Sequence, residues 1–325
     1  MDGQRYRNAA ASHFEHLPPS VSVVIPTFNR CEHLLQMLDS WARQIGIDGK
    51  DYEIVIADDG SSDASADCIR EWAETSQVRV VLAWQTTNRG PAYARNRALA
   101  VARGEILLIT GDDIVPPLDF VARHLAWHRA HTEEQSALLG RVVWPDAPTP
   151  TPFMRWLETA GHAFYFDFPD VAGEVPPDRF YTCNVSLKRA LVSRCGGFRE
   201  DFPFASHEDL EMGMRLAQTG GMRLHYDPDL KAVHNHLLTP ESSVRRVYLN
   251  GYSSILYWQR VADDSPRWRC AARRLCRGAA GLVPRKLIWR MASLTPRRGW
   301  YAMLALAYWR GAADAVRGDR PFAFS

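Results

Sequence analysis

The sequence lacks several features that would define its chemistry at once. No stretch matches GxGxxG or GxxxxGK[ST], the glycine-rich loops that hold a dinucleotide or the phosphates of ATP. The six cysteines form no CxxC pair and are scattered through segments expected to be helices and strands. This scatter favours reduced thiols in a cytosolic compartment over a disulfide framework.

Long apolar runs are also missing. The first twenty residues include His13, Glu15 and His16 and lack the apolar core of a signal peptide. The apolar stretch near the end, Trp300 to Trp309, has about half the length that a membrane-spanning helix requires. We therefore expect a protein that is neither secreted by that route nor inserted across a bilayer.

Net charge is small but unevenly distributed. The 325 residues carry a formal charge of +2, yet the segment from Glu241 onward holds 16 Lys and Arg against 5 Asp and Glu. The remainder has 23 basic and 32 acidic residues, so an acidic body precedes a basic, Trp-rich end. This asymmetry predicts that the end meets a phosphate-bearing surface, with a membrane as one candidate.

Strand-like and helix-like segments alternate in the first third of the chain. Val21 to Ile25 is a β-branched run closed by Pro26, and apolar residues from Leu34 to Ala42 then recur with helical spacing. Further strands are expected at 53–57, 78–84 and 105–110, with helices between them. Repeated alternation with short links predicts a three-layer α/β sandwich around a mostly parallel central sheet.

Two of the predicted strands end in paired aspartates, at Asp58-Asp59 and at Asp112-Asp113. The carboxyl ends of parallel strands lie along one edge of a sheet, so both pairs can face one crevice. Adjacent carboxylates repel unless a cation neutralises them, which a divalent metal carrying phosphates would do. A simple turn, with Asp113 near a helix start, explains Gly111-Asp112-Asp113 equally well.

The second half of the chain is less regular. The prolines and aromatics after Trp144 predict an irregular connection, followed by a strand at 180–186 and a helix at 188–194. Glu208-Asp209 begins a helix that runs to Gln218, where acids favour the helix dipole without any chemistry. If 231–236 is extended, His234 and His236 share a face, although such a pair is usually structural.

Helices are expected from Glu241 to the end, where arginines and tryptophans interleave. Such a helix can lie on an anionic membrane surface or pack against the body of the protein, and the sequence favours neither. Nothing here matches a nucleic-acid-reading module, so no nucleic acid is expected as a partner. The most amphipathic segment has an apolar face with basic flanks: Leu282, Val283, Leu287, Ile288 and Met291 on the face, with Arg285, Lys286 and Arg290 beside it.

Three segments resemble the successive motifs of the family 2 glycosyltransferases. They are Val21 to Arg30, Ile56 to Asp63 and Asn88 to Asn96, and Asp112-Asp113 stands where that family has its metal-binding acidic motif. The later residues Glu208-Asp209 and His234 match in order and rough spacing. The resemblance covers about Ser20 to Leu238 and is specific as an ordered set, although each motif alone is weak.

This resemblance implies a GT-A fold and inverting transfer of a sugar from a nucleotide-sugar donor to an acceptor hydroxyl. Residues 1–19 would be an N-terminal extension and residues 20–239 the GT-A domain. Within that domain, 20–115 would bind the nucleotide sugar and 116–239 would carry the acceptor and catalytic half. Residues 240–325 would be a basic helical C-terminal region.

The resemblance also implies roles for individual residues. Asp209, beside Glu208, would be the catalytic base, and Asp113 and Asp112 with His234 would hold Mn²⁺ or Mg²⁺. The chain departs from the commonest form of the acidic motif in having Thr110 two positions before Asp112. The nucleotide sugar would be bound by residues from the first strands and the third helix: Pro26, Thr27, Phe28, Asp58, Asp59, Arg95 and Asp112.

Two other functions fit the same residues. A metal-dependent hydrolase of nucleotide sugars could use the clustered aspartates, and a catalytically silent nucleotide-binding protein could use the basic end to dock at a membrane. For the transferase, the expected acceptor is a saccharide or lipid-linked saccharide, as in the assembly of a bacterial-type polysaccharide or glycolipid. The expected location is the cytoplasm, with peripheral contact at the inner face of the plasma membrane.

Overall fold

The computed structural model describes residues 5–7, 18–160, 170–202, 204–261 and 299–321. Contacts divide the chain into two compact units. The first comprises Met1–Asp146, Asp167–Glu200 and Met212–His236. The second comprises Ala147–Phe166, Asp201–Glu211 and Leu237–Ser325.

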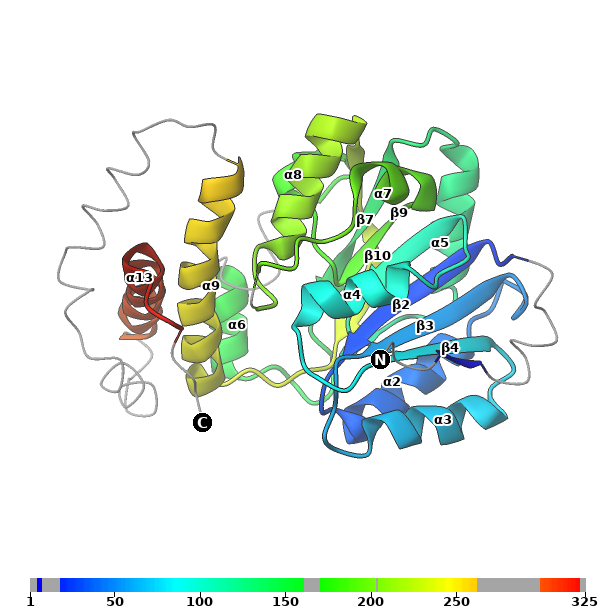
Figure 1. The fold of residues 1–325 in the computed structure, drawn as a ribbon, viewed down its shortest axis with the longest axis horizontal. Helices are drawn as coiled ribbons and strands as arrows, with labels where there is room; N and C mark the ends of the chain where they lie inside the picture. Colours follow the sequence, from blue (N-terminus) through cyan, green and yellow to red (C-terminus); the bar gives the residue numbers. More distant parts are fainter. Residues whose placement is uncertain (1–4, 8–17, 161–169, 203, 262–298, 322–325) are drawn as a thin grey trace. The chain divides into compact units, whose positions relative to one another are not determined.

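The first unit is built on a ten-stranded mixed sheet (Figure 1). The order of the strands is β1-β4-β3-β2-β5-β9-β7-β10-β6, and β8 pairs with β10. The strands are β1 (Arg5–Arg7), β2 (Val21–Thr27), β3 (Tyr52–Asp58), β4 (Arg79–Trp84), β5 (Ile106–Thr110), β6 (Ile114–Val115), β7 (Ser136–Val143), β8 (Gly173–Val175), β9 (Asn184–Lys188) and β10 (Arg223–His234).

The parallel half of the sheet follows the alternation expected from the sequence. β2 pairs in parallel with both β3 and β5, and β3 pairs in parallel with β4. The helices α2 (Cys31–Ala42), α3 (Ser65–Thr75) and α4 (Pro91–Leu99) connect these strands. Right-handed crossovers put α2 and α3 on one face and α4 on the other, which gives the three layers (Figure 1).

The other half of the sheet is mixed. β9 lies antiparallel between β5 and β7, and β7 pairs in parallel with β10. β10 continues through Asp227-Pro228, because a register shift between Asp227 and Lys231 accommodates the proline. The helices here are α5 (Phe120–Ala130), the 3₁₀ turn η1 (Pro177–Arg179), α7 (Arg189–Cys195) and α8 (Glu208–Gly220), whose first turn belongs to the second unit.

The expectation of reduced cysteines is wrong for two of them. Cys31 and Cys68 form a disulfide with an S–S distance of 2.04 Å. The two residues lie on α2 and α3, which follow the neighbouring strands β2 and β3, so the fold brings them together across 37 positions of sequence. Cys183 and Cys195 are free thiols, and Cys270 and Cys276 lie outside the described residues.

The second unit is helical. α9 (Pro240–Val261) and α13 (Trp300–Arg317) cross so closely that a Cβ on Gly251 would lie 1.9 Å from the carbonyl oxygen of Tyr308. The buried Asp314 of α13 accepts a 2.6 Å hydrogen bond from the Tyr248 hydroxyl of α9. Arg317 also donates to Asp314, so this buried carboxylate is paired as well as hydrogen-bonded.

A short helix joins this pair. α6 (Pro152–Thr159) forms where the sequence predicts an irregular connection, and its Thr151 cap accepts from the Met154 amide. The rings of Phe153 and Trp156 contact Trp300 at centroid distances of 4.9 and 5.5 Å. Part of the Trp-rich end is therefore core packing.

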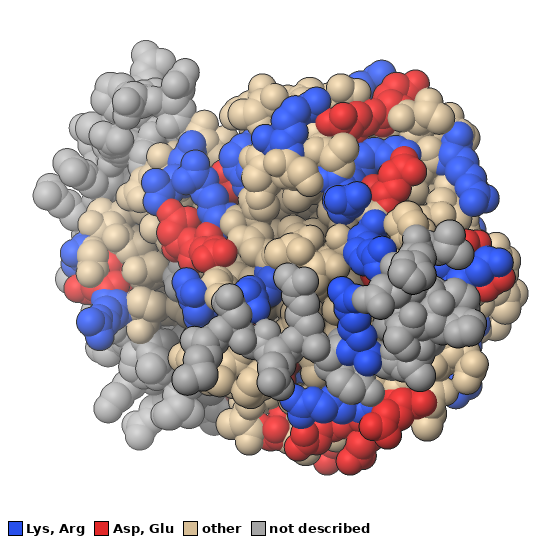
Figure 2. All heavy atoms as spheres, turned by 45° about the vertical axis from the view of Figure 1, so that its right-hand side comes forward, with Lys and Arg blue, Asp and Glu red and all other residues tan. Residues whose placement is uncertain are grey.

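The membrane contact expected of the basic end falls largely on residues outside the described part of the chain. The amphipathic segment 282–291 lies outside the described residues. Within the described residues, no helix is both long and apolar enough to cross a bilayer. On the face drawn in Figure 2, basic and acidic side chains are interspersed rather than gathered into a patch of one sign.

A buried polar cluster ties α5 to β9 in the first unit. The Ser186 hydroxyl lies 2.8 Å from Nδ1 of His124 and 2.9 Å from Nε2 of His128. Asn184 adds a 3.2 Å contact to Nε2 of His124. Burial is the main cause that lowers the pKa of each histidine from 6.5 to about 3. The next cause is repulsion between protonated His124 and His128 for the first and the charge of Lys188 for the second, so both imidazoles are neutral in the folded protein.

We expect the stability of the protein to fall in mild acid. The folded-state pKa of His124 and His128 lies below the unfolded value, so the unfolded chain binds more protons between about pH 3 and about pH 6.5. The free energy of unfolding should decrease by up to about 1.4 kcal/mol per pH unit for each histidine below about pH 6. Asp112, whose pKa is raised to about 6, has the opposite sign and offsets part of this loss.

Urea denaturation at a series of pH values from about 7 to about 5 measures the slope. A His128→Gln variant should show a shallower slope than the wild type, whatever its stability at neutral pH. Equal slopes in the two proteins would contradict the assignment of the acid sensitivity to this cluster.

Candidate functional site

The acidic residues predicted from the sequence lie at one edge of the sheet. Thr27, Asp58 and Thr110 are the last residues of β2, β3 and β5, and β2 is the middle strand of the three. The carbonyl oxygen of Thr27 accepts from the Asp59 amide at 2.9 Å, and its hydroxyl donates to Oδ2 of Asp112 at 2.9 Å. Thr27 therefore links the two acidic pairs, which confirms that they share an edge.

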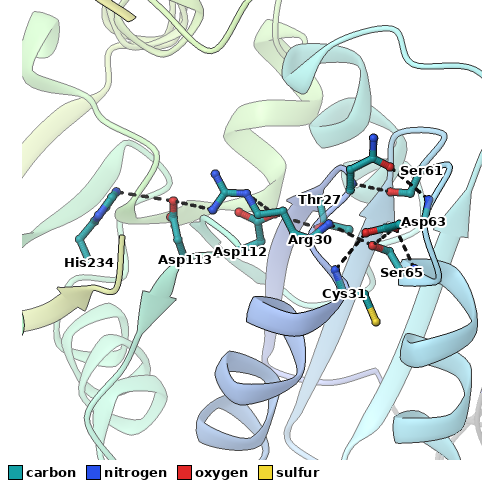
Figure 3. A network of polar contacts seen from close by, with 10 residues as sticks. Thr27, Arg30, Cys31, Ser61, Asp63, Ser65, Asp112, Asp113 and His234 are labelled. Atoms are coloured by element: carbon teal, nitrogen blue, oxygen red, sulfur yellow. Dashed lines mark hydrogen bonds and ion pairs between the residues drawn. The ribbon is translucent and has the colours of Figure 1, made fainter. Parts of the chain in front are cut away.

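Asp112 and Asp113 are flanked by an arginine and a histidine (Figure 3). Oδ2 of Asp113 lies 3.5 Å from Nη1 of Arg30 and 3.7 Å from Nε2 of His234, and Oδ2 of Asp112 lies 4.0 Å from Nε of Arg30. Burial, followed by the charge of Asp113, raises the pKa of Asp112 to about 6, although Arg30 and the Thr27 hydroxyl act in the opposite direction.

β10 brings His234 to this point. His234 ends the strand and pairs in register with Ile114 of β6, directly after the acidic pair. The amide of Asn235 donates to the carbonyl oxygen of Asp113 at 2.8 Å, which fixes the backbone there. His234 is buried beside Trp144. The rings of His234 and His236 lie 5.8 Å apart, so the two histidines are neighbours even though β10 ends at His234.

The other acidic pair organises the loop between β4 and α4. Asp59 accepts from the amides of Arg89 at 2.9 Å and Gly90 at 2.7 Å, and also from the Gln85 side chain. Burial raises its pKa, although these hydrogen bonds lower it. Asp58 is also buried and accepts from the Ser61 amide at 2.9 Å, so both acids shape loops at the sheet edge.

The other residues that are expected to bind the nucleotide sugar differ in exposure. Phe28 is 42% exposed directly after β2, and Pro26 is half-buried within the strand. Arg95 is buried on α4, with its guanidinium 5.3 Å from the centre of the Phe198 ring. The neighbouring Asn96 exchanges hydrogen bonds of 2.8 Å with the backbone of Phe198, so this part of α4 is held to the segment after α7.

Glu208 and Asp209 begin α8 in the second unit. Glu208 is buried and Asp209 is half-buried, with Oδ1 of Asp209 accepting from the Leu210 amide at 2.9 Å. His207 adopts a left-handed backbone with φ of 67° immediately before the helix. Its Nδ1 lies 2.7 Å from the Ser206 hydroxyl, and burial lowers its pKa to about 4.

α9 packs on this turn. The ring of Tyr257 lies 5.7 Å from that of His207, and Tyr252 contacts Phe204 edge to face. Arg260 forms an ion pair with Asp201 at the start of the same segment. The C-terminal region thus helps to fix the backbone that carries Asp209.

A sequence profile described as Glycosyl transferase family 2 matches residues 22–196, more than half of the chain. The chain belongs to the family 2 glycosyltransferases. It is 31% identical over 223 residues to validoxylamine A glucosyltransferase of Streptomyces hygroscopicus subsp. jinggangensis, a match that covers 62% of this chain and 52% of that protein. It therefore spans about half the length of that curated relative.

Two further comparisons cover more of the chain. The uncharacterized glycosyltransferase YfnE of Bacillus subtilis is 32% identical over 258 residues, covering 66% of this chain and 64% of YfnE. The solved structure of mannosyltransferase PcManGT from Pyrobaculum calidifontis, in complex with GDP-Man and Mn²⁺, is 25% identical. It superposes with a TM-score of 0.59 over 95% of this chain and 93% of its own, which agrees with the GT-A fold.

The carboxylates of Asp112 and Asp113 at this edge of the sheet fit a divalent metal. Within the described residues, no group of three or more His, Cys, Asp or Glu side chains is arranged as a ready-made metal cage. Mg²⁺ and similar hard cations need no such cage, because they bind through one or two carboxylates and complete their coordination with substrate phosphates and water. The carboxylates of Asp113 and Asp112 supply that kind of donor set, and the imidazole of His234 lies 3.7 Å from Asp113.

Arg30 is the site residue to which sequence reasoning gave no role. Arg30 ends the first of the three motifs, and its guanidinium lies beside both Asp112 and Asp113. The position of Arg30 in the sequence could have suggested this contact, because Arg30 is the last residue before α2 and follows β2, the strand next to β5. Gly60 is a second residue that could have marked this edge of the sheet. Its φ is +78° and a Cβ there would lie 2.7 Å from the Thr87 backbone, so the turn after Asp59 requires glycine.

Proposed function

We propose that this family 2 protein transfers a sugar from a nucleoside-diphosphate sugar to an acceptor hydroxyl, with inversion at the anomeric carbon and with the aid of Mn²⁺ or Mg²⁺. The observation that carries the proposal is the Thr27-linked edge, where Asp112, Asp113 and His234 meet beside a second acidic pair. The complex of PcManGT with GDP-Man and Mn²⁺ supports the same ligand class. We also propose that residues 20–239 are the catalytic domain, with 20–115 as its donor half.

The chemistry of the leaving group explains the need for these residues. Departure of a nucleoside diphosphate adds negative charge to phosphate oxygens, which a bound divalent metal would stabilise as a Lewis acid. In the proposal, Thr27 orients Asp112 by donating to Oδ2, and His234 and the backbone contact of Asn235 hold Asp113. Asp59 accepts hydrogen bonds from the backbone amides of Arg89 and Gly90, and so holds the loop of residues 85–90 near the proposed site of the nucleotide sugar.

Asp209 is the proposed base. The acceptor hydroxyl must lose its proton as it attacks the anomeric carbon, and an ionised carboxylate can take that proton. The first turn of α8 favours the ionised form through the helix dipole. Asp209 is half-buried and so is partly accessible from solvent, whereas Glu208 next to it is buried.

A panel of nucleotide sugars tests the donor site. One donor should raise the melting temperature in the presence of Mn²⁺ or Mg²⁺, because ligand binding to the folded state stabilises it by about 2.7 kcal/mol at a concentration of about 100 Kd. The shift should be lost in Asp113→Ala and kept in Asp178→Asn, a control that alters an exposed carboxylate on η1.

The panel also separates the two other candidate functions. A donor that is consumed without any acceptor would indicate a hydrolase, and a donor that binds but is never consumed would indicate a silent binding protein. If no donor or free nucleotide shifts the melting temperature at any metal concentration, the proposed function is wrong.

Replacing Asp209 tests the base. Asp209→Asn should lose about 10² to 10⁴ in turnover, the usual contribution of a positioned general base, while its melting-temperature shift with donor and metal stays that of the wild type. Steady-state rates with saturating donor measure the loss. Near-normal turnover would remove Asp209 from this role.

The acceptor side of the proposal is a saccharide or lipid-linked saccharide at an anionic membrane surface. The excess of 16 Lys and Arg over 5 Asp and Glu after position 240 supports it. Because α9 packs on the turn before α8, removing the whole end would disturb the fold, so we would neutralise Arg285, Lys286 and Arg290 together. Flotation with anionic liposomes should weaken by about 1 kcal/mol per charge removed, and unchanged flotation would exclude this segment as the contact.

A further inference from the structure

Arg30 lies where a bound cation would act. Its Nη1 hydrogen-bonds Oδ2 of Asp113 at 3.5 Å, and Oδ2 of the same residue is 3.7 Å from His234. Its Nε is 4.0 Å from Oδ2 of Asp112 (Figure 3). One guanidinium thus offsets the repulsion between the two adjacent carboxylates.

The backbone of Arg30 is held firmly in place. Its amide donates to the Ser65 hydroxyl at 3.1 Å, and the Cys31 amide donates to Asp63 at 3.3 Å. The preceding Asn29, with φ of 53°, donates to Ser61 and accepts from the amide of Ser62 on the same loop. The disulfide of Cys31 ties this segment to α3, so the loop after β3 fixes the starting point of the arginine side chain.

The guanidinium itself is held more loosely than its backbone. Its side chain is 30% exposed, and its distances of 3.5 and 4.0 Å exceed those of a close charge-assisted hydrogen bond, about 2.8 Å. The oxygen that it contacts on Asp113 is one that metal coordination would use, and two cations at one carboxylate oxygen repel each other. A side chain with a fixed backbone and a loose, solvent-facing head can leave without disturbing the fold.

We propose that Arg30 is a displaceable counter-ion of the acidic pair. Its guanidinium neutralises Asp112 and Asp113 in the free protein and leaves Asp113 when a divalent cation binds. The inference rests on the proposed function, because it takes Asp113 as a metal ligand. Its consequence is that the free protein binds the metal weakly, so that metal enters the site together with the phosphates of the donor rather than ahead of it.

Direct titration of the full-length protein with Mn²⁺ alone, followed by electron paramagnetic resonance of the free ion, tests the inference without any turnover. Arg30→Gln should bind Mn²⁺ about five-fold more tightly than the wild type, because a competing positive charge within about 4 Å has been removed. Arg30→Met, a second neutral variant that keeps the apolar stem, should show the same gain. Circular dichroism melting establishes that each variant is folded.

Two control variants isolate the effect of the charge. Arg30→Lys retains a positive charge and should bind Mn²⁺ within about two-fold of the wild type. Arg43→Gln removes an arginine at the opposite end of α2, which pairs with Asp39 on the surface, and should not change Mn²⁺ affinity.

The outcomes separate this inference from the proposed function. If the wild type binds Mn²⁺ but both neutral variants bind it equally or less tightly, Arg30 is not a competing counter-ion and the inference is wrong. If neither the wild type nor any variant binds Mn²⁺, with or without nucleotide, the metal assignment of the proposed function fails, and the inference fails with it.

Discussion

The repulsion between the adjacent carboxylates of Asp112 and Asp113 is the constraint on which the site depends. Two such groups at the end of a buried strand are costly unless hydrogen bonds and positive charge offset them. The fold supplies both from separate strands, with a hydroxyl from β2, a guanidinium from the loop after β2 and an imidazole from the end of β10. The long strand β10 and the short strand β6 therefore complete the site as well as the sheet.

The parallel half of the fold could be predicted from the sequence because its signals are local. The apolar runs that became β2, β3, β4 and β5, and the acids that follow them, each depend on a few neighbouring residues. The antiparallel insertion of β9 could not be predicted in the same way. Its partners, 106–110 and 137–139, lie about 80 and about 50 positions away along the chain, and hydrophobic periodicity carries no information about which strand pairs with which.

The site shows the same division. Asp112, Asp113 and His234 could be proposed as a set because a family resemblance orders them, whereas the contact of Arg30 with the pair arises from the packing of two loops. The Cys31–Cys68 disulfide is missed for that reason too, since the proximity of α2 and α3 comes from neighbouring strands rather than from a short cysteine spacing. The length of strand β10 is also hard to predict, because a proline such as Pro228 normally interrupts a ladder, and only the register shift in the folded sheet removes the conflict.

The crossing of α9 and α13 bears on how this protein can vary. Each helix presents a glycine to the backbone of the other, Gly251 to Tyr308 and Gly311 to Tyr248, so the crossing point is set by direct backbone contact. The location of α13 within its unit thus depends on these glycines and on Asp314, and not on the length of the chain that joins the two helices. A side chain at either position would have to displace backbone rather than a flexible neighbour, so these two positions tolerate little variation while they set the spacing of the helices.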